Sequence, residues 1–247
     1  MTSNILSKIF AAAIAGCGLM IAPIAEAAPL IPDEEAEVDV SAAGCLEADK
    51  CITDLTEFGI ASITSLVDDS TGTASRLFVD TQLTANIYSD PDAEFNNYVE
   101  FLESGDEGTR PLEFVYRPST DEENGRLEVG TFRIDFLAPM TELIVDFFDV
   151  EWFRTTAVLG INGEEFETPD YIETGSDVVS RVYEGVTSIL LQVGFDQDGE
   201  NRTGDGVSFA LRTPDGAAVP EPGSIVALSA LAGGFLLKRR NGLSTEA

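Results

Sequence analysis

Apolar and polar side chains alternate along the middle of the chain. Every second residue is apolar from 131 to 136 and again from 143 to 148, and this period of two indicates half-buried β-strands. Residues 138–141, which read Ala-Pro-Met-Thr, lie between the two runs and are typical of a turn. We therefore predict that the two runs pair as an antiparallel hairpin.

A second hairpin is predicted farther along the chain. A β-branched run at 155–161 ends at Asn162-Gly163, a pair that favours a tight hairpin turn, and 164–167 continues beyond it. About eight short strands without a convincing helix predict an all-β fold, which we expect to be a single jelly-roll-like β-sandwich over 55–212. The remaining strands are predicted at 77–83, 98–102, 112–117, 188–195 and 207–211.

Four aromatic side chains near the centre of this domain are interpreted as packing in its core or at its rim. They are Phe147, Phe148, Trp152 and Phe153. The alternative is that one of them is exposed and serves as a platform for a sugar ring, because an aromatic ring offers a flat apolar surface.

Two flanking segments differ from the domain in composition. Residues 28–54 begin with a stretch rich in Asp, Glu, Ala and Pro, so we expect an acidic, flexible leader that carries a cysteine pair. Residues 213–218 are short, polar and small, and we interpret them as a linker.

The N-terminus predicts export. Lys8 precedes an apolar stretch at 9–19, and Ala25-Glu26-Ala27 has the small-x-small pattern of a cleavage site, so residues 1–27 are predicted to be a signal peptide removed by signal peptidase. An alternative interpretation takes 14–17 as a lipobox, in which Cys17 would be acylated.

Charge and the missing histidines exclude several functions. The chain has 14 Lys and Arg against 44 Asp and Glu, a net charge of -30, so it would repel nucleic acid. Without histidine it has no Ser/His/Asp relay and no histidine zinc ligand. We assign no catalytic residue and expect no organic cofactor, although a glycosidase with two carboxylates is compatible with this composition.

The cysteine pattern agrees with export. Cys45 and Cys51 are the cysteines left after the signal peptide is removed, and in an oxidising compartment they are expected to form one disulfide across a small loop. The alternative is a pair of free thiols.

The loop at 196–206 is the best local candidate for metal binding. Asp196, Asp198 and Glu200 alternate as the first ligands of a calcium loop do, and Asp205 follows. The sequence then departs from an EF-hand, because Asn201 stands where that loop has its glycine. Calcium is therefore an optional ligand here, and the alternative is a polar turn.

The C-terminal residues 219–247 form a three-part pattern. Pro220-Glu221-Pro222 comes first, an apolar run at 224–237 follows, and the cations Lys238, Arg239 and Arg240 come last. This order resembles the PEP-CTERM sorting domain of exported bacterial proteins, which implies recognition by a membrane transpeptidase of the exosortase type. The run at 224–237 would cross the membrane and the cations would set its orientation. The alternative is an ordinary membrane anchor that is not processed.

A second resemblance lies inside the domain. Residues 127–154, which begin Leu-Glu-Val-Gly, are similar to the central block of the LEVG family of PEP-CTERM proteins. The two resemblances imply an exported protein that is anchored in the membrane and then attached to the cell envelope or extracellular matrix, without enzymatic activity. The principal alternative is a carbohydrate-binding module for extracellular polysaccharide, with or without calcium, and a glycoside hydrolase is third.

Overall fold

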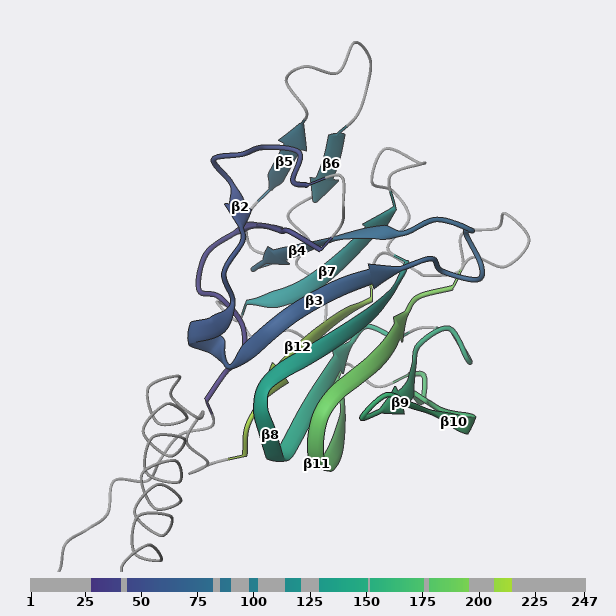
Figure 1. The fold of residues 1–247 in the computed structure, drawn as a ribbon. Helices are drawn as coiled ribbons and strands as arrows, with labels where there is room; N and C mark the ends of the chain where they lie inside the picture. The colour runs from purple at the N-terminus through teal and green to yellow at the C-terminus, as the bar shows by residue number, and fades with distance from the viewer. Residues whose placement is uncertain are drawn as a thin grey trace, which may run out of the picture.

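The all-β prediction is confirmed. The structure, a computed structural model, describes residues 28–40, 44–81, 85–89, 98–101, 114–120, 129–150, 152–175, 178–195 and 207–214, and these contain twelve strands and one short 3-10 helix (Figure 1). The elements are β1 (Ala36–Val38), β2 (Cys51–Ile52), η1 (Thr56–Phe58), β3 (Ile60–Leu66), β4 (Ser75–Asp80), β5 (Asn86–Ser89), β6 (Tyr98–Phe101), β7 (Val115–Thr120), β8 (Gly130–Phe148), β9 (Ala157–Ile161), β10 (Glu164–Tyr171), β11 (Val178–Val193) and β12 (Ser208–Arg212).

Most strands belong to one large sheet. Its ten strands include the path β10-β9-β11-β8-β12-β7-β4-β1-β2, and β3 pairs with β8 beside this path. The pairs are antiparallel except for β1 with β2. The hairpin of β5 and β6 forms a separate two-stranded sheet.

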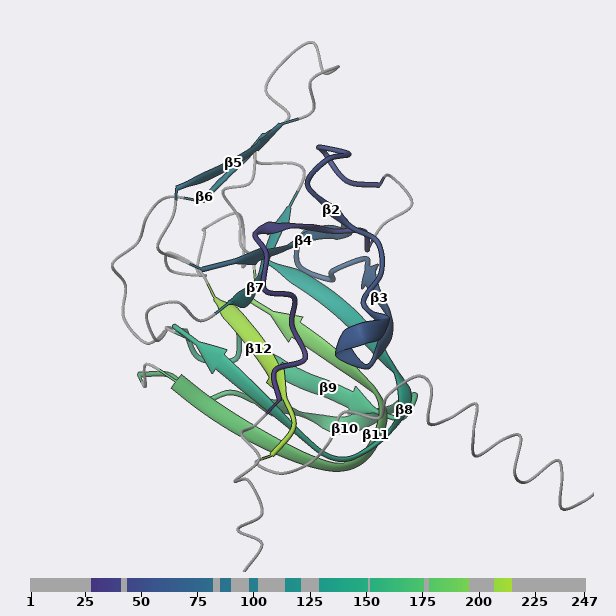
Figure 2. The same cartoon turned by 90° about the vertical axis from the view of Figure 1, so that its left-hand side faces the viewer.

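The strand β8 replaces the hairpin predicted between 131–136 and 143–148, and that prediction is wrong. β8 runs through both segments as one strand of 19 residues and pairs with β11 along its whole length. The register shifts between the pairs Asp135↔Ser188 and Met140↔Val186, which leaves Pro139 in a bulge. A proline lacks the N–H that a ladder needs, so a bulge accommodates it, and the strand bends instead of reversing. Figures 1 and 2 show β8 and β11 curving together.

The bend places both parts of β8 on one hydrophobic core. Phe132 and Ile134 from its first part share a buried cluster with Val145 and Phe147 from its second part. Side chains from β1, β2, β3, β4, β7, β9, β11 and β12 also belong to this cluster. In the first part the inward positions are those that the alternating pattern marks as apolar, whereas 143–148 is buried on both faces and is not the half-buried strand that we predicted.

The hairpin predicted at Asn162-Gly163 is confirmed. Ile161 pairs with Glu164 across the turn, and the two turn residues have φ of 57° and 80°. Two consecutive residues with positive φ are the mark of the type I′ turn, which matches the twist of the flanking strands.

The segment 28–54 is not the flexible leader that we expected. Its residues 36–38 form β1, which pairs with β2 and β4, and Leu30 donates its backbone N–H to Leu211 O at 2.8 Å. Leu30, Val38 and Val40 are buried in the main core. The acidic residues alternate with apolar ones, so the segment has side chains to bury despite its composition.

A second, smaller core lies under the β5–β6 hairpin. Phe78 of β4 packs against Tyr88 and Phe101 from the hairpin, with ring centroids 4.7 and 5.2 Å away. Arg117 of β7 lies over the Phe101 ring at 4.3 Å and forms a buried ion pair with Asp80, with 2.7 Å between Nη1 and Oδ2. The hairpin is therefore held by aromatic packing above a buried charge pair.

Candidate functional site

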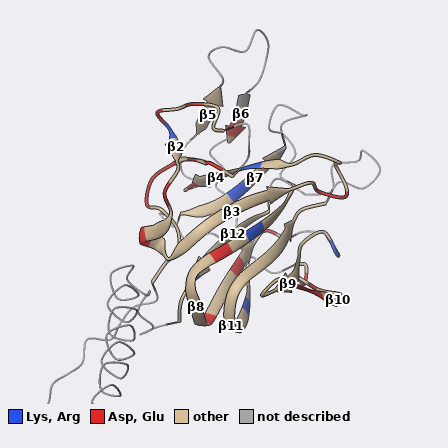
Figure 3. Ribbon diagram, in the orientation of Figure 1, with Lys and Arg blue, Asp and Glu red and all other residues tan. Residues whose placement is uncertain are grey.

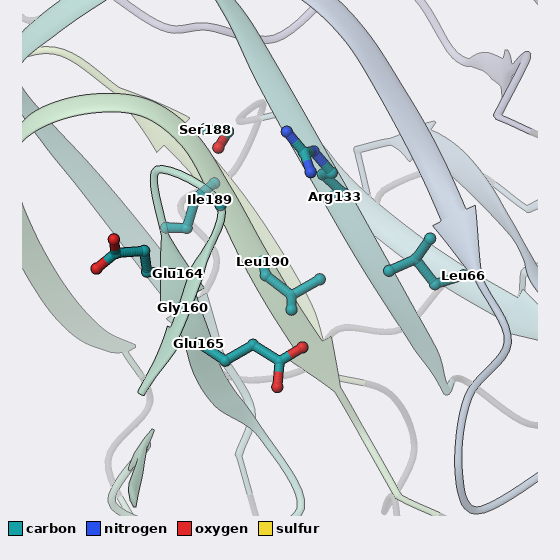
Figure 4. A pocket seen from close by; sticks show the side chains of 9 residues that line it. Leu66, Arg133, Gly160, Glu164, Glu165, Ser188, Ile189 and Leu190 are labelled. Carbon is teal, nitrogen blue, oxygen red and sulfur yellow. The ribbon is translucent and has the colours of Figure 1, made fainter. Parts of the chain in front are cut away.

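A groove of about 150 Å³ lies between the β9–β10 hairpin and the strands β3, β8 and β11 (Figure 4). It is the clearest candidate for a ligand site among the described residues. Its lining residues are Leu66, Arg133, Gly160, Gly163, Glu164, Glu165, Ser188, Ile189 and Leu190.

A single cross-strand row builds the groove. Arg133 on β8 pairs with Leu190 on β11, and Leu190 pairs with Gly160 on β9. Gly160 in turn pairs with Glu165 on β10. Because cross-strand partners lie on the same face of a sheet, the row places a cation at one wall, a leucine on the floor and a carboxylate at the other wall (Figure 4).

Gly160 is required by the close approach of β10. A Cβ at this position would clash with the backbone oxygen of Glu164 and would lie 2.8 Å from Glu165 Cα. Glycine lets the two backbones approach, and it leaves the floor open between Leu190 and the hairpin.

The turn that ends the groove is anchored to β11. Asn162 Oδ1 accepts hydrogen bonds from the backbone N–H of Thr187 at 2.6 Å and from its hydroxyl at 2.9 Å. Asn162 Nδ2 donates to Gly185 O at 3.0 Å. These contacts fix the β9–β10 hairpin relative to β11, so the groove has a defined width before any ligand binds.

Arg133 is oriented by a neighbour on its own strand. Its Nε and Nη2 donate to the Asp135 carboxylate at 2.9 to 3.1 Å, and the two side chains are 47% and 32% exposed. The hydrogen bonds and the charge of Asp135 raise the pKa of Arg133 above its usual value. Nη1 makes no hydrogen bond to any residue that the structure describes, so its donors remain available in the groove.

The aromatic predictions divide into two outcomes. Phe147 and Phe148 are buried, as expected for packing. Packing in the core is wrong for Trp152 and Phe153, because they are 48% and 71% exposed. Both lie in the connection between β8 and β9, and the Arg154 guanidinium lies 4.9 Å from the Phe153 ring centroid.

Cys45 and Cys51 are joined by a disulfide, with 5.7 Å between their Cα atoms. The bond closes the loop that leads into β2, beside the buried Glu37 of β1. Leu46, inside this loop, belongs to the core under the β5–β6 hairpin. The disulfide therefore holds a short loop against β1 and against the core under the β5–β6 hairpin.

The other predicted sites lie outside the described residues. This applies to Asp196, Asp198, Glu200 and Asp205, to Pro220, Glu221 and Pro222, and to Lys238, Arg239 and Arg240. Within the described ranges, no three His, Cys, Asp or Glu side chains are grouped closely enough to hold a metal ion. In the same ranges we find no helix with the length and apolar character needed to cross a bilayer.

The groove residues were missed by the sequence analysis. Gly160 interrupts a β-branched run, and Arg133 stands at an outward position between two buried residues, Phe132 and Ile134. These are signals of a close backbone approach and of an exposed strand face. Neither signal shows that the two residues meet, because only the strand pairing brings them together.

Comparison with known proteins gives no relative: no protein-family model, curated protein or solved structure matches the chain.

Proposed function

We propose that the protein is an exported, non-enzymatic component of the cell envelope or extracellular matrix, of the LEVG family of PEP-CTERM proteins. In this proposal signal peptidase removes 1–27, the segment 224–237 anchors the chain in the membrane, and an exosortase-type transpeptidase then processes it near Pro220-Glu221-Pro222. Lys238, Arg239 and Arg240 stay on the cytoplasmic side and fix the orientation.

The order of the three parts of the C-terminal tail carries this proposal. The disulfide between Cys45 and Cys51 supports it, because such bonds persist in oxidising compartments outside the cytosol. The net charge of -30 is compatible with it as well, since a strongly charged protein stays soluble at the cell surface. Figure 3 marks the charged positions of the described residues along the ribbon.

We also infer that the bent sheet is a jelly-roll-like β-sandwich. The support is the single buried cluster to which both parts of β8 contribute, because two sheet layers that face each other share one core. β8 and β11 would then pass from one layer to the other at their bulges.

The export proposal is tested by mapping the C-terminal peptides of the mature protein from its native cell. We expect the last peptide to end near Pro222, with everything after it absent. The segment 224–237 has 14 residues in the sequence, and at about 1.5 Å per residue a helix of this length spans about 21 Å, less than the hydrocarbon core of about 30 Å. Such a segment suits a temporary anchor. Recovery of residues 241–247 on the mature form would contradict processing.

A second candidate function is carbohydrate binding. The exposure of Trp152 and Phe153 favours it, because exposed aromatic rings can stack on the apolar faces of sugar rings. The full chain should bind a glycan in a screen, and Trp152→Ala should weaken this binding. Calcium, compared with magnesium at equal ionic strength, tests the loop at 196–206. Equal binding with both ions would remove calcium from this proposal, and no glycan binding at all would refute the function.

A further inference from the structure

The size of the groove limits what it can hold. At about 150 Å³ it is smaller than the roughly 300–1,000 Å³ of pockets that enclose a drug-sized ligand. A larger molecule can therefore place only one ring-sized part in it. The rest of that molecule would extend along the exposed strands on either side.

The floor of the groove is apolar. Leu190 lies at its centre, and Leu66 on β3 flanks it beyond Arg133 (Figure 4). Leu66 is among the large apolar side chains that the fold leaves exposed. An apolar floor of this kind favours a ligand with a face of C–H groups, because contact removes apolar surface from water.

The walls offer both donors and acceptors of hydrogen bonds. Arg133 Nη1 supplies donors on the β8 side, and the Asp135 carboxylate orients this side chain by accepting from its Nε and Nη2. Glu165 supplies an acceptor on the β10 side, with no ion pair to any described residue. The Ser188 hydroxyl, between the walls, can do both. A ligand with several hydroxyl groups matches this set, since each hydroxyl donates and accepts.

The charges of the groove disfavour an anionic ligand, and its hydrogen-bonding groups favour a neutral ligand over a cation. Glu164 and Glu165 line one side of the groove and the whole chain carries -30, so an anion is repelled. Asp135 balances the charge of Arg133, so the groove does not repel a cation, but a cationic group has no acceptor for the donors of Arg133 and Ser188. A neutral ligand with hydroxyl groups avoids the repulsion that an anion meets, and it uses both the donors and the acceptors of the groove.

We propose that this groove binds one sugar residue of a neutral glycan, with its C–H face on Leu190 and its hydroxyls between Arg133 and Glu165. This inference rests on the carbohydrate-binding function proposed above, and it adds the site and the ligand class. The anchored turn at Asn162 keeps the two walls in place, so little ordering is needed on binding.

The test is calorimetric titration of the full chain with cellohexaose, maltohexaose, mannohexaose and xylohexaose, and with hexagalacturonate as the charged counterpart. We expect at least one neutral hexaose to bind and hexagalacturonate to bind at least tenfold more weakly. Arg133→Met keeps the aliphatic stem and removes the donors, and Leu190→Trp fills the groove. Each should lower the affinity at least tenfold.

Arg181→Met is the matched control. Arg181 is also a surface arginine in an ion pair, with 3.7 Å between its Nε and Asp170 Oδ1, but it does not line the groove. Its replacement should leave the affinity unchanged. Thermal melting checks that each variant folds, and Glu165→Gln, at an exposed position of the edge strand β10, is a further groove variant should Leu190→Trp unfold.

The outcomes separate the site from the function. If the wild type binds a hexaose and Trp152→Ala abolishes binding while Arg133→Met and Glu165→Gln do not change it, carbohydrate binding stands and the groove is the wrong site. If hexagalacturonate binds as tightly as the neutral hexaoses, the assignment of a neutral ligand is overturned. If no oligosaccharide binds, both the groove proposal and the carbohydrate-binding function are wrong.

Discussion

Removal of the buried carboxylate of Asp80 should cost a large part of the stability of the fold. Asp80 and Arg117 form an ion pair with 2.7 Å between their atoms, and their side chains are 0% and 6% exposed. Asp80→Ala leaves the charge of Arg117 in a buried place without this carboxylate. Breaking a buried pair on one side costs about 3–5 kcal/mol, against a typical total of about 5–15 kcal/mol.

The assay is urea unfolding of the purified protein, followed by circular dichroism. With a slope of about 2 kcal/mol per molar urea, the loss corresponds to a fall in the midpoint of roughly 1.5–2.5 M. Arg117→Met in the same chain should recover most of this loss, because the methionine still packs against Phe101 and brings no charge. The double variant should therefore be more stable than Asp80→Ala alone.

Asp135→Ala is the matched control for Asp80→Ala. Its partner Arg133 is also an arginine on a strand, but the pair is exposed to solvent, so its loss should cost less than about 1 kcal/mol. If Asp80→Ala costs no more than Asp135→Ala, burial does not set the strength of the pair. If the stability lost by the double variant equals the sum of the losses of Asp80→Ala and Arg117→Met measured separately, Asp80 and Arg117 are not energetically coupled.

Three further predictions concern pH, packing and redox state. Burial raises the pKa values of Tyr88, Tyr116 and Tyr183. The neutral hydroxyls therefore stabilise the fold below the ordinary tyrosine pKa of about 10, and this stability is lost as the pH rises further. The urea midpoint should decrease when the pH is raised from about 9 to about 11, and a constant midpoint would contradict this. Gly160→Ala should cost about 1–3 kcal/mol through its clash with the β10 backbone, and an unchanged melting temperature would show that β10 moves aside freely. Cys45 and Cys51 of the exported protein should resist alkylation until they are reduced, and modification without a reductant would disprove the disulfide in that compartment.

The pattern of apolar and polar residues predicted those parts of the fold that depend on neighbouring residues in the sequence. The alternation around Phe132 located a strand segment with its buried face, and Asn162-Gly163 located a hairpin. The run around Phe147 located a strand segment that is buried on both faces. The link between 131–136 and 143–148 was not predictable in the same way. Pro139 is compatible with a turn and with a bulge, and the choice depends on β11, which pairs across the bend from a distant part of the sequence.

The composition of the segment 28–54 led to a wrong prediction of a flexible leader. Its acidic residues suggested a chain with little to bury, but burial depends on single positions and not on the average. Val38 enters the core, and Glu37 beside it is buried because Arg76 pairs with it at 2.5 Å. A buried carboxylate is tolerated when a cation and hydrogen bonds compensate it, and the sequence does not show which cation will be adjacent.

The groove illustrates the same limit for function. Its row combines β8, β9, β10 and β11, and the chain reaches Arg133, Gly160, Glu165 and Leu190 at separate points. No short motif contains this set, so a search for motifs cannot find it. The calcium and sorting predictions came from contiguous segments, and those segments lie outside the described residues, where they remain predictions.

The positions of the cations give a further reason to regard the groove as functional. Cations are scarce in this chain, at 14 against 44 acidic residues, and most of those in the described ranges serve the fold or pair at its surface. Arg133 differs from them in its position, because it lines the groove, where its Nη1 donors are used by no described residue. A surface pair of this kind contributes little to stability, and this holds for Arg181 as well as for Arg133. The place of Arg133 in the groove is therefore what the comparison of Arg133→Met with Arg181→Met tests. The others in structural or surface pairs are Arg76 with Glu37, Arg117 with Asp80, Arg212 with Asp146, Arg181 with Asp170, and Lys50 with Glu47.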